Sequence, residues 1–180
     1  VTHDNIDILN ELYKIFNVMD IDSWRIINIV PLGRAKQYPE LLLTPDDYRY
    51  MFEYIRNKRI AGEPVTYGCS HYLGLEYERE VRDWYYLCVA GTYIASIMAN
   101  GDITACLDIE RRPEFIRGNI LKDRFKDVWE NNFDIFRKDI GDENEKCRNC
   151  SEKCRCHGDS YHSWDFDKGE PQLCFKDILF

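Results

Sequence analysis

Cys147-Arg-Asn-Cys150-Ser-Glu-Lys-Cys154-Arg-Cys156 is the most informative stretch of this chain, and Cys174 follows it after 17 further residues. Thiolates are soft ligands, and two of them separated by two residues can face one ion or cluster from a single tight turn. The spacing therefore predicts a metal-binding site, holding either zinc or an iron-sulfur cluster.

The composition limits the classes of protein to which the chain can belong. It has 180 residues, a formal net charge of -8 and a pI near 5.1, and such an acidic surface repels nucleic acid. No apolar run approaches the roughly 20 residues of a membrane span, and the first residues lack the basic and apolar parts of a signal peptide. We expect a cytoplasmic protein with neither nucleic acid nor membrane as a partner.

The eight cysteines are best explained, in a reducing compartment, as metal ligands or reactive thiols. In a secreted protein an even number of cysteines would instead indicate disulfides. A thiol redox protein would need a low-pKa Cys-x2-Cys pair at a helix N-terminus, whereas Cys147 and Cys150 follow an acidic polar stretch. Metal ligation is therefore the favoured interpretation.

Residues 1–69 show helix and strand patterns in alternation. This order implies parallel βα units. Two strands do not make a stable sheet alone, so either the sheet pairs with another chain or this chain is a piece of a longer protein, as the missing initiating methionine also indicates. We expect four elements: a helix over 5–18, a buried apolar strand over 24–30, a helix that begins at Thr44-Pro45 with Tyr48, Met51, Phe52 and Ile55 on its apolar face, and a short strand over 65–69.

Arg34 follows the first of these expected strands. In parallel α/β folds, ligands bind at the carboxyl ends of the strands, which makes Arg34 a candidate cofactor-binding residue. A solvated arginine in a loop is the alternative interpretation.

Residues 93–107 have the pattern of a β-hairpin. Asn100-Gly101 separates two apolar runs, and this pair favours a two-residue type I′ turn, in which both central residues have positive φ. Such a hairpin would carry Cys106 back toward the segment that holds Cys88. A helix is expected near residues 123–137, and we interpret its apolar side as core rather than as a cofactor site: Phe125, Val128, Trp129, Phe133 and Phe136.

The cysteines also carry a family resemblance. Their order resembles the seven-cysteine signature of the SPASM domain, the C-terminal extension of many radical S-adenosylmethionine (AdoMet) enzymes: Cys88-x12-Gly101-x4-Cys106, then Cys147-x2-Cys150-x5-Cys156, and finally Cys174. The resemblance covers about residues 85–180. Upstream, a strand ending in Pro-x-Gly-Arg and a helix opened by Leu-Thr-Pro-Asp-Asp resemble the last βα units of the partial (β/α)6 barrel of such enzymes.

The resemblance implies an α/β (α+β) fold in two parts. Residues 1–75 would be a remnant of the partial (β/α)6 barrel, and residues 76–180 a small Cys-rich SPASM module with a β-hairpin and helices. Two departures matter, because Ser160 stands where the family has a further cysteine, and the chain lacks the Cys-x3-Cys-x2-Cys loop that holds the AdoMet-cleaving cluster. The resemblance thus implies an enzyme as the parent and an inactive chain by itself, and we assign no catalytic residue.

The matching positions imply two sets of metal ligands. One auxiliary [4Fe-4S] cluster would be held by Cys147, Cys150, Cys156 and Cys174. For the other, the resemblance implies Cys88, Cys106, a cysteine a little upstream and the cysteine that Ser160 replaces. Cys69 could be the upstream ligand and the unmatched Cys154 could substitute for the absent one, since eight cysteines make two sets of four. Alternatively, this second cluster has three protein ligands and an open iron, or it is absent and Cys69 and Cys154 are small buried residues.

Zinc is the simpler alternative, because four thiolates also form a tetrahedral zinc site. His157 and His162 lie among the cysteines and could join such a site, but we interpret both as hydrogen-bond donors in a loop. The remaining polar and aromatic residues of this loop are expected to shape it, and hydrogen bonds to sulfur there would tune a cluster: Asp159, Ser160, Trp164 and Asp165.

The resemblance also implies a function for the parent protein. It would be an oxidoreductase or maturase that modifies a peptide or protein, with an N-terminal half that cleaves AdoMet and auxiliary clusters that transfer electrons or bind substrate. Its partners would be that N-terminal half, the substrate and an electron donor or acceptor. The rival is a zinc-stapled structural or protein-binding module without a redox role, which metal content distinguishes.

Overall fold

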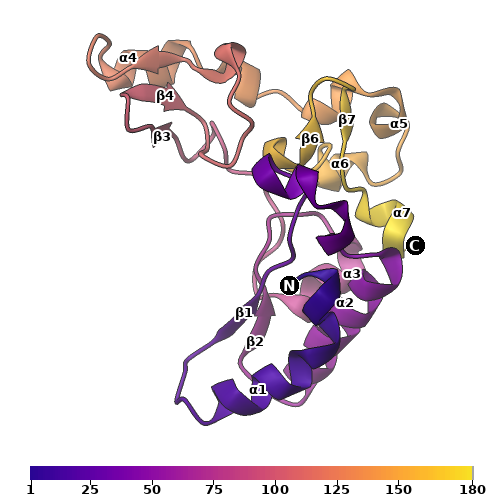
Figure 1. Ribbon diagram of the computed structural model, residues 1–180. Coiled ribbons are helices and arrows are strands. Elements are labelled where there is room, and N and C mark those ends of the chain that lie inside the picture. The colour runs from indigo at the N-terminus through magenta and orange to yellow at the C-terminus, as the bar shows by residue number, and fades with distance from the viewer. Residues whose placement is uncertain (180) are drawn as a thin grey trace. The chain divides into compact units, whose positions relative to one another are not determined.

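The computed structural model describes residues 1–179, which form two compact units (Figure 1). The first unit consists of residues 1–86 together with 174–179, and the second of residues 87–173. The units thus divide after Tyr86, whereas the family resemblance placed a domain boundary at 75/76, and Cys174 belongs to the first unit. No helix among residues 1–179 is both long enough and apolar enough to cross a membrane.

The first unit has a small parallel sheet, and its helices lie beside that sheet (Figure 1). Its two strands pair with Trp24 opposite Val65 and Ile26 opposite Tyr67. The predicted alternation of helices and parallel strands is therefore confirmed. In chain order the elements are a 3-10 helix His3–Ile8, α1 Leu9–Asn17, β1 Trp24–Ile26, 3-10 helices Gly33–Gln37 and Pro39–Leu41, α2 Pro45–Ile60, β2 Val65–Tyr67, α3 Gly74–Val81 and α7 Phe175–Leu179.

Helix α2 begins where the sequence predicts. Thr44 is its N-cap: the Thr44 hydroxyl accepts a hydrogen bond from the Asp47 amide at 3.2 Å, and the Asp47 carboxylate accepts one from the Thr44 amide at 2.8 Å. Such a reciprocal pair satisfies amides that the first helical turn leaves free. The predicted apolar face is buried: Tyr48, Met51, Phe52 and Ile55.

The predicted buried strand over residues 24–30 is shorter than expected. β1 ends at Ile26, and burial then alternates, because Ile27 is exposed while Asn28 is buried. One face of this segment is therefore exposed to solvent, and the apolar run does not indicate a strand that is covered on both faces.

The second unit contains the expected β-hairpin within an antiparallel sheet of order β3-β4-β5, and β6 and β7 form a second small antiparallel pair. The second unit is therefore a Cys-rich module with a hairpin and helices. Its elements are β3 Ser96–Ile97, β4 Asp102–Thr104, a 3-10 helix Pro113–Phe115, β5 Gly118–Asn119, α4 Phe125–Asn131, 3-10 helices Asp134–Phe136 and Ile140–Glu143, α5 Glu145–Arg148, α6 Lys153–Cys156, a 3-10 helix Tyr161–Ser163, β6 Trp164–Asp165 and β7 Glu170–Pro171.

The predicted type I′ turn of the hairpin is wrong. Within residues 93–107 only Gly101 has positive φ, at +88°, whereas a type I′ turn requires it at both central residues. The Gly101 amide bonds the Met98 carbonyl at 2.8 Å, and the Met98 amide bonds the Asp102 carbonyl at 2.8 Å, so the loop has three residues. The Asn100 side chain bonds Asp102 at 2.6 Å instead of adopting the left-handed conformation.

The helix expected over residues 123–137 is interrupted. α4 ends at Asn131, and the carbonyl of Asn132 accepts a hydrogen bond from Arg117 Nε at 2.5 Å, which withdraws this carbonyl from a continued helix. Most of the apolar side nevertheless packs as predicted. Val128, Phe133 and Phe136 belong to the core of the second unit and Trp129 packs against it, so the core interpretation is confirmed there, whereas Phe125 is exposed.

Candidate metal centre

None of the eight cysteines, all of which lie among the described residues, forms a disulfide. Cys154 is exposed, whereas the other seven are partly buried. In the part of the chain that the structure describes, no three or more Cys, His, Asp or Glu side chains lie together as a ready-made metal site. Six of the thiols belong to the second unit, Cys88, Cys106, Cys147, Cys150, Cys154 and Cys156, and two to the first, Cys69 and Cys174.

The hairpin brings Cys106 close to Cys88, as predicted. Burial raises the pKa of the Cys106 thiol, and the charges of neighbouring Asp108 and Cys88 raise this pKa further. Cys88, Cys106 and Cys147 also pack against the core of the second unit. These three thiols are therefore fixed to a rigid frame and partly shielded from water.

Two short helices present the cysteines of the stretch 147–156. Asn144 caps α5, because its side-chain oxygen accepts a hydrogen bond from the Cys147 amide at 3.1 Å, while its side-chain nitrogen donates to the Gly169 carbonyl at 2.9 Å. The Cys150 sulfur accepts a hydrogen bond from the Glu152 amide at 3.4 Å. Amide hydrogen bonds of this kind stabilise a metal-bound thiolate, because they favour its charged form.

The loop after Cys156 is held by close backbone packing. Gly158 has φ of +86° and lies so close to Gly141 that a Cβ on Gly158 would come within 2.5 Å of the Gly141 nitrogen. Gly141 N also donates to the His157 carbonyl at 3.1 Å. His157 Nδ1 lies 3.0 Å from an Asp139 carboxylate oxygen, which agrees with the interpretation of His157 as a loop residue.

The predicted loop-shaping residues do shape this loop. Trp164 Nε1 donates to the Gly158 carbonyl at 2.5 Å, and the Asp159 carboxylate accepts a hydrogen bond from Ser163 at 3.0 Å. Asp165 accepts the amides of residues 167 and 168 at 3.1 and 3.2 Å. Ser160, at the position of the absent family cysteine, is completely buried, so this part of the loop is packed rather than open.

The donor set fits an iron-sulfur cluster or zinc. Thiols are the preferred ligands of both, and the second unit offers six of them, with an amide hydrogen bond to one sulfur and core packing behind three others. Binding would draw the thiols together and release their protons, since metals bind the thiolate.

Cys69 lies just beyond β2 in a polar network that sequence reasoning missed. Its sulfur donates to the Asn28 carbonyl at 3.7 Å, and Asn28 Oδ1 accepts a hydrogen bond from the Tyr67 hydroxyl at 2.7 Å. Asn28 Nδ2 in turn lies 3.4 Å from the hydroxyl of Tyr48. Burial raises the pKa of the Cys69 thiol. In the sequence, the one indication of this network was Asn28, the only asparagine within the apolar run over residues 24–30.

The remaining sequence candidates lie in different places. Arg34 is exposed in the 3-10 helix Gly33–Gln37. Cys174 immediately precedes α7, whose Phe175 is buried against the rings of Tyr48 and Phe52 at centroid distances of 5.0 and 5.7 Å. The first unit also contains a buried ion pair between Glu78 and Arg82. In the sequence, their i,i+4 spacing could have indicated this pair.

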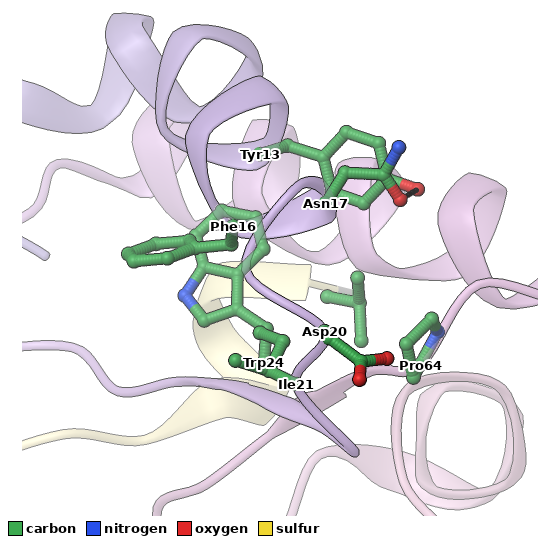
Figure 2. A pocket seen from close by; sticks show the side chains of 8 residues that line it. Tyr13, Phe16, Asn17, Asp20, Ile21, Trp24 and Pro64 are labelled. Atoms are coloured by element: carbon green, nitrogen blue, oxygen red, sulfur yellow. Dashed lines mark hydrogen bonds between the residues drawn. The ribbon is translucent and has the colours of Figure 1, made fainter.

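Figure 2 shows a pocket at the opposite end of the small sheet from Cys69. It has a volume of about 230 Å³, and the rings of Phe16 and Trp24, 5.1 Å apart, form one wall. Trp24 and Val65 line it and are the first residues of their strands, so the pocket opens at the amino ends of β1 and β2. Because parallel sheets bind ligands at the carboxyl ends, we do not count this pocket as part of the candidate site.

Residues 88–151 match a family model, SPASM, which is described as an iron-sulfur cluster-binding domain. This segment of the chain is thus similar to the SPASM domain family. The match includes Cys88, Cys106, Cys147 and Cys150, the hairpin and α4. The family resemblance of the sequence is therefore confirmed.

The curated AdoMet-dependent heme synthase of Oleidesulfovibrio alaskensis is 22% identical over 175 residues, which cover 88% of this chain and 44% of the relative. The solved structure of native anSMEcpe with bound AdoMet matches with a TM-score of 0.66 and 19% identity, over 99% of this chain and 50% of that one. Native anSMEcpe with bound AdoMet and Kp18Cys peptide matches with a TM-score of 0.63 and 19% identity, over 99% and 51%.

The similarity to the solved structures, at 19% identity, concerns the fold. It shows that this chain shares their mixed α/β architecture. The chain spans about half the length of the relatives that it matches.

Proposed function

We propose that this chain is the auxiliary-cluster portion of a radical AdoMet enzyme that modifies a peptide or protein. The observation that carries the proposal is the coincidence of a SPASM match with six cysteines in one compact unit, none of them in a disulfide. Iron-sulfur clusters there would transfer single electrons or bind substrate at an open iron.

The thiols of the second unit fall into two groups that would hold metal. Cys88 and Cys106 pack near each other against the core. Cys147 lies in α5, Cys150 follows the end of α5 by two residues, and Cys156 ends α6. The core behind these thiols would exclude water, and the Glu152 amide would support the Cys150 thiolate. The assignments of Cys69, Cys174 and Cys154 stay predictions from the family resemblance.

The first unit would be the remnant of a partial (β/α)6 barrel. Its support is the parallel pairing of β1 and β2, with helices α2 and α3 following in the order that βα units require. The half of the relatives' length that this chain does not span would supply AdoMet cleavage. Arg34, near the carboxyl end of β1, stays a candidate contact for a cofactor in that complete barrel.

The substrate class is the least constrained part of the proposal. Two similar solved structures contain a peptide, whereas the curated relative is named for heme synthesis. We propose a peptide or protein because the structural match extends over 99% of this chain, compared with 88% for the curated relative. Turnover of a tetrapyrrole, and not of peptides, by the parent enzyme would refute this choice.

The ligand assignment is testable by serine substitution in anaerobically purified protein. Cys150→Ser should lose about half or more of the bound iron together with the broad absorbance of sulfur-to-iron charge transfer, because it removes a thiolate ligand. Ser151→Ala, next to it in the same turn, serves as the matched control and should keep both. Unchanged iron in Cys150→Ser would contradict the assignment.

The same series decides the role of Cys154. Loss of iron in Cys154→Ser would identify it as the replacement for the absent cysteine. Retention of iron would favour an incomplete ligand set, since Cys154 is exposed and outside the family spacing.

A further inference from the structure

The first unit contains an ion pair that is removed from water. The side chain of Arg82 is 0% exposed and that of Glu78 is 1% exposed, and the two lie four residues apart at the end of α3. Arg82 Nε donates to Glu78 Oε2 at 2.9 Å, and Arg82 Nη2 donates to Glu78 Oε1. A bidentate pair of this kind has a fixed geometry, because both groups are planar.

The remaining donors of Arg82 hold the backbone of the segment that follows β2. Nη1 donates to the Cys69 carbonyl at 2.8 Å, and Nη2 donates to the His71 carbonyl at 2.5 Å. A lysine in this position could not reproduce the arrangement, since it has no planar fork with which to reach two carbonyls and a carboxylate.

Glu78 completes the network on its other side. Its carboxylate accepts hydrogen bonds from the amides of Leu73 and Tyr86, each at 2.9 Å. The Arg82 guanidinium also lies 5.6 Å from the ring centroid of Tyr67 and 6.0 Å from that of Tyr86. Both members of the pair therefore form further hydrogen bonds, and their surroundings are apolar and aromatic. Buried polar networks are rigid when their groups are hydrogen-bonded in this way.

His71 connects this network to the second thiol of the first unit. Its ring lies 5.4 Å from the ring of Phe175, which is buried and directly follows Cys174. Cys69 is two residues before His71. Both thiol-bearing segments of the first unit thus converge on one histidine whose carbonyl Arg82 holds.

We propose that Arg82 is a positioning residue for the two thiols of the first unit. It fixes Cys69 directly through the carbonyls of Cys69 and His71, and it fixes Cys174 through the packing of His71 on Phe175. The use of these thiols as cluster ligands rests on the proposed function, whereas their placement by Arg82 does not.

The test is the alkylation rate of each cysteine in the folded chain, measured by mass spectrometry after timed exposure to iodoacetamide without oxygen. Arg82→Lys keeps a positive charge beside Glu78 but releases at least one carbonyl, so the rates at Cys69 and Cys174 should rise about tenfold, because local opening governs access to partly buried thiols. Thiols of the second unit, such as Cys106, should keep their rates. Arg79→Lys, an exposed arginine on the same helix, is the matched control and should change none of them.

A role limited to charge pairing predicts a different result. In that case the lysine variant would react like the unchanged protein at Cys69 and Cys174, and the positioning role would be overturned. A second measurement needs no variant: in the unchanged protein the Leu73 and Tyr86 amides should exchange hydrogen as slowly as those of α2, since both are bonded to Glu78. Exchange of these amides at the rate of an exposed loop would equally overturn it.

Iron content separates this proposal from the proposed function. A chain that binds no iron but shows the tenfold effect would refute the cluster role and leave the positioning role intact. A chain that binds iron but whose alkylation rates do not change in Arg82→Lys would refute the positioning role and leave the cluster role intact.

Discussion

Gly158 shows how single residues determine the loop behind the candidate metal centre. It combines a left-handed backbone, φ +86°, with direct contact to the backbone of Gly141, and the carbonyl of Gly158 accepts the indole N–H of Trp164. No side chain fits this position. The loop that follows Cys156 therefore depends on a glycine for reasons both of conformation and of space.

Gly158→Ala should reduce the free energy of unfolding by at least about 2 kcal/mol, because it adds a clash to the strain of positive φ. Gly169→Ala is the control, since Gly169 also has positive φ, +67°, but has nothing within 4 Å of an added Cβ. It should cost only about 1 kcal/mol. Denaturant unfolding measures both, and equal losses would contradict the close-packing argument.

At the scale of elements, the carboxylate of Asp102 adds a side-chain link to the backbone pairing of the hairpin with β5. Asp102 accepts hydrogen bonds from Asn119 at 3.0 Å and from Asn100 at 2.6 Å. These bonds lower the pKa of Asp102 below its ordinary value of 3.8. A lowered carboxyl pKa stabilises the folded state above pH 3.8 and ceases to do so as the pH falls through the lower folded value.

The hairpin should therefore loosen in acid, and Asp102→Asn should remove this part of the pH dependence. Amide hydrogen exchange of the hairpin, followed by mass spectrometry from about pH 5 to about pH 2.5, tests the expectation. Glu114→Gln, a change of an exposed carboxylate, is the control. An identical pH profile in unchanged protein and Asp102→Asn would show that Asp102 does not contribute.

Elements with local signals were predictable from the sequence, and those with distant partners were not. Helix α2 was predictable because Thr44, Pro45 and Asp47 lie next to one another and form the cap by themselves. The end of α4 depends on Arg117, 15 residues from Asn132, and no pattern in either segment indicates that contact. The hairpin turn failed because the side chain of Asn100 bonds Asp102, which the Asn-Gly preference does not take into account.

The candidate site was predictable to a different extent in each unit. In the second unit, cysteine spacing identified the thiols, because metal chemistry constrains spacing directly. In the first unit, the sequence named Cys69 but neither Asn28 nor Arg82, since buried polar partners are set by packing between segments that lie far apart in the chain. The sequence thus did not reveal that the side chains of Asn28 and Arg82 are buried.

At the scale of the whole molecule, the chain combines a Cys-rich unit that matches the SPASM family with a unit that has parallel strands. We propose that the thiols of the Cys-rich unit hold iron-sulfur clusters. Zinc would bind the same thiols but would leave the chain with no redox role, so the identity of the metal decides between an electron-transfer module and a structural one.

The content of iron, acid-labile sulfide and zinc per chain, in protein purified without oxygen, distinguishes these two roles. We expect about four irons for each [4Fe-4S] cluster, with sulfide in equal amount, and therefore about four or about eight irons in total. Stoichiometric zinc without sulfide, persisting after anaerobic reconstitution with iron and sulfide, would contradict this expectation.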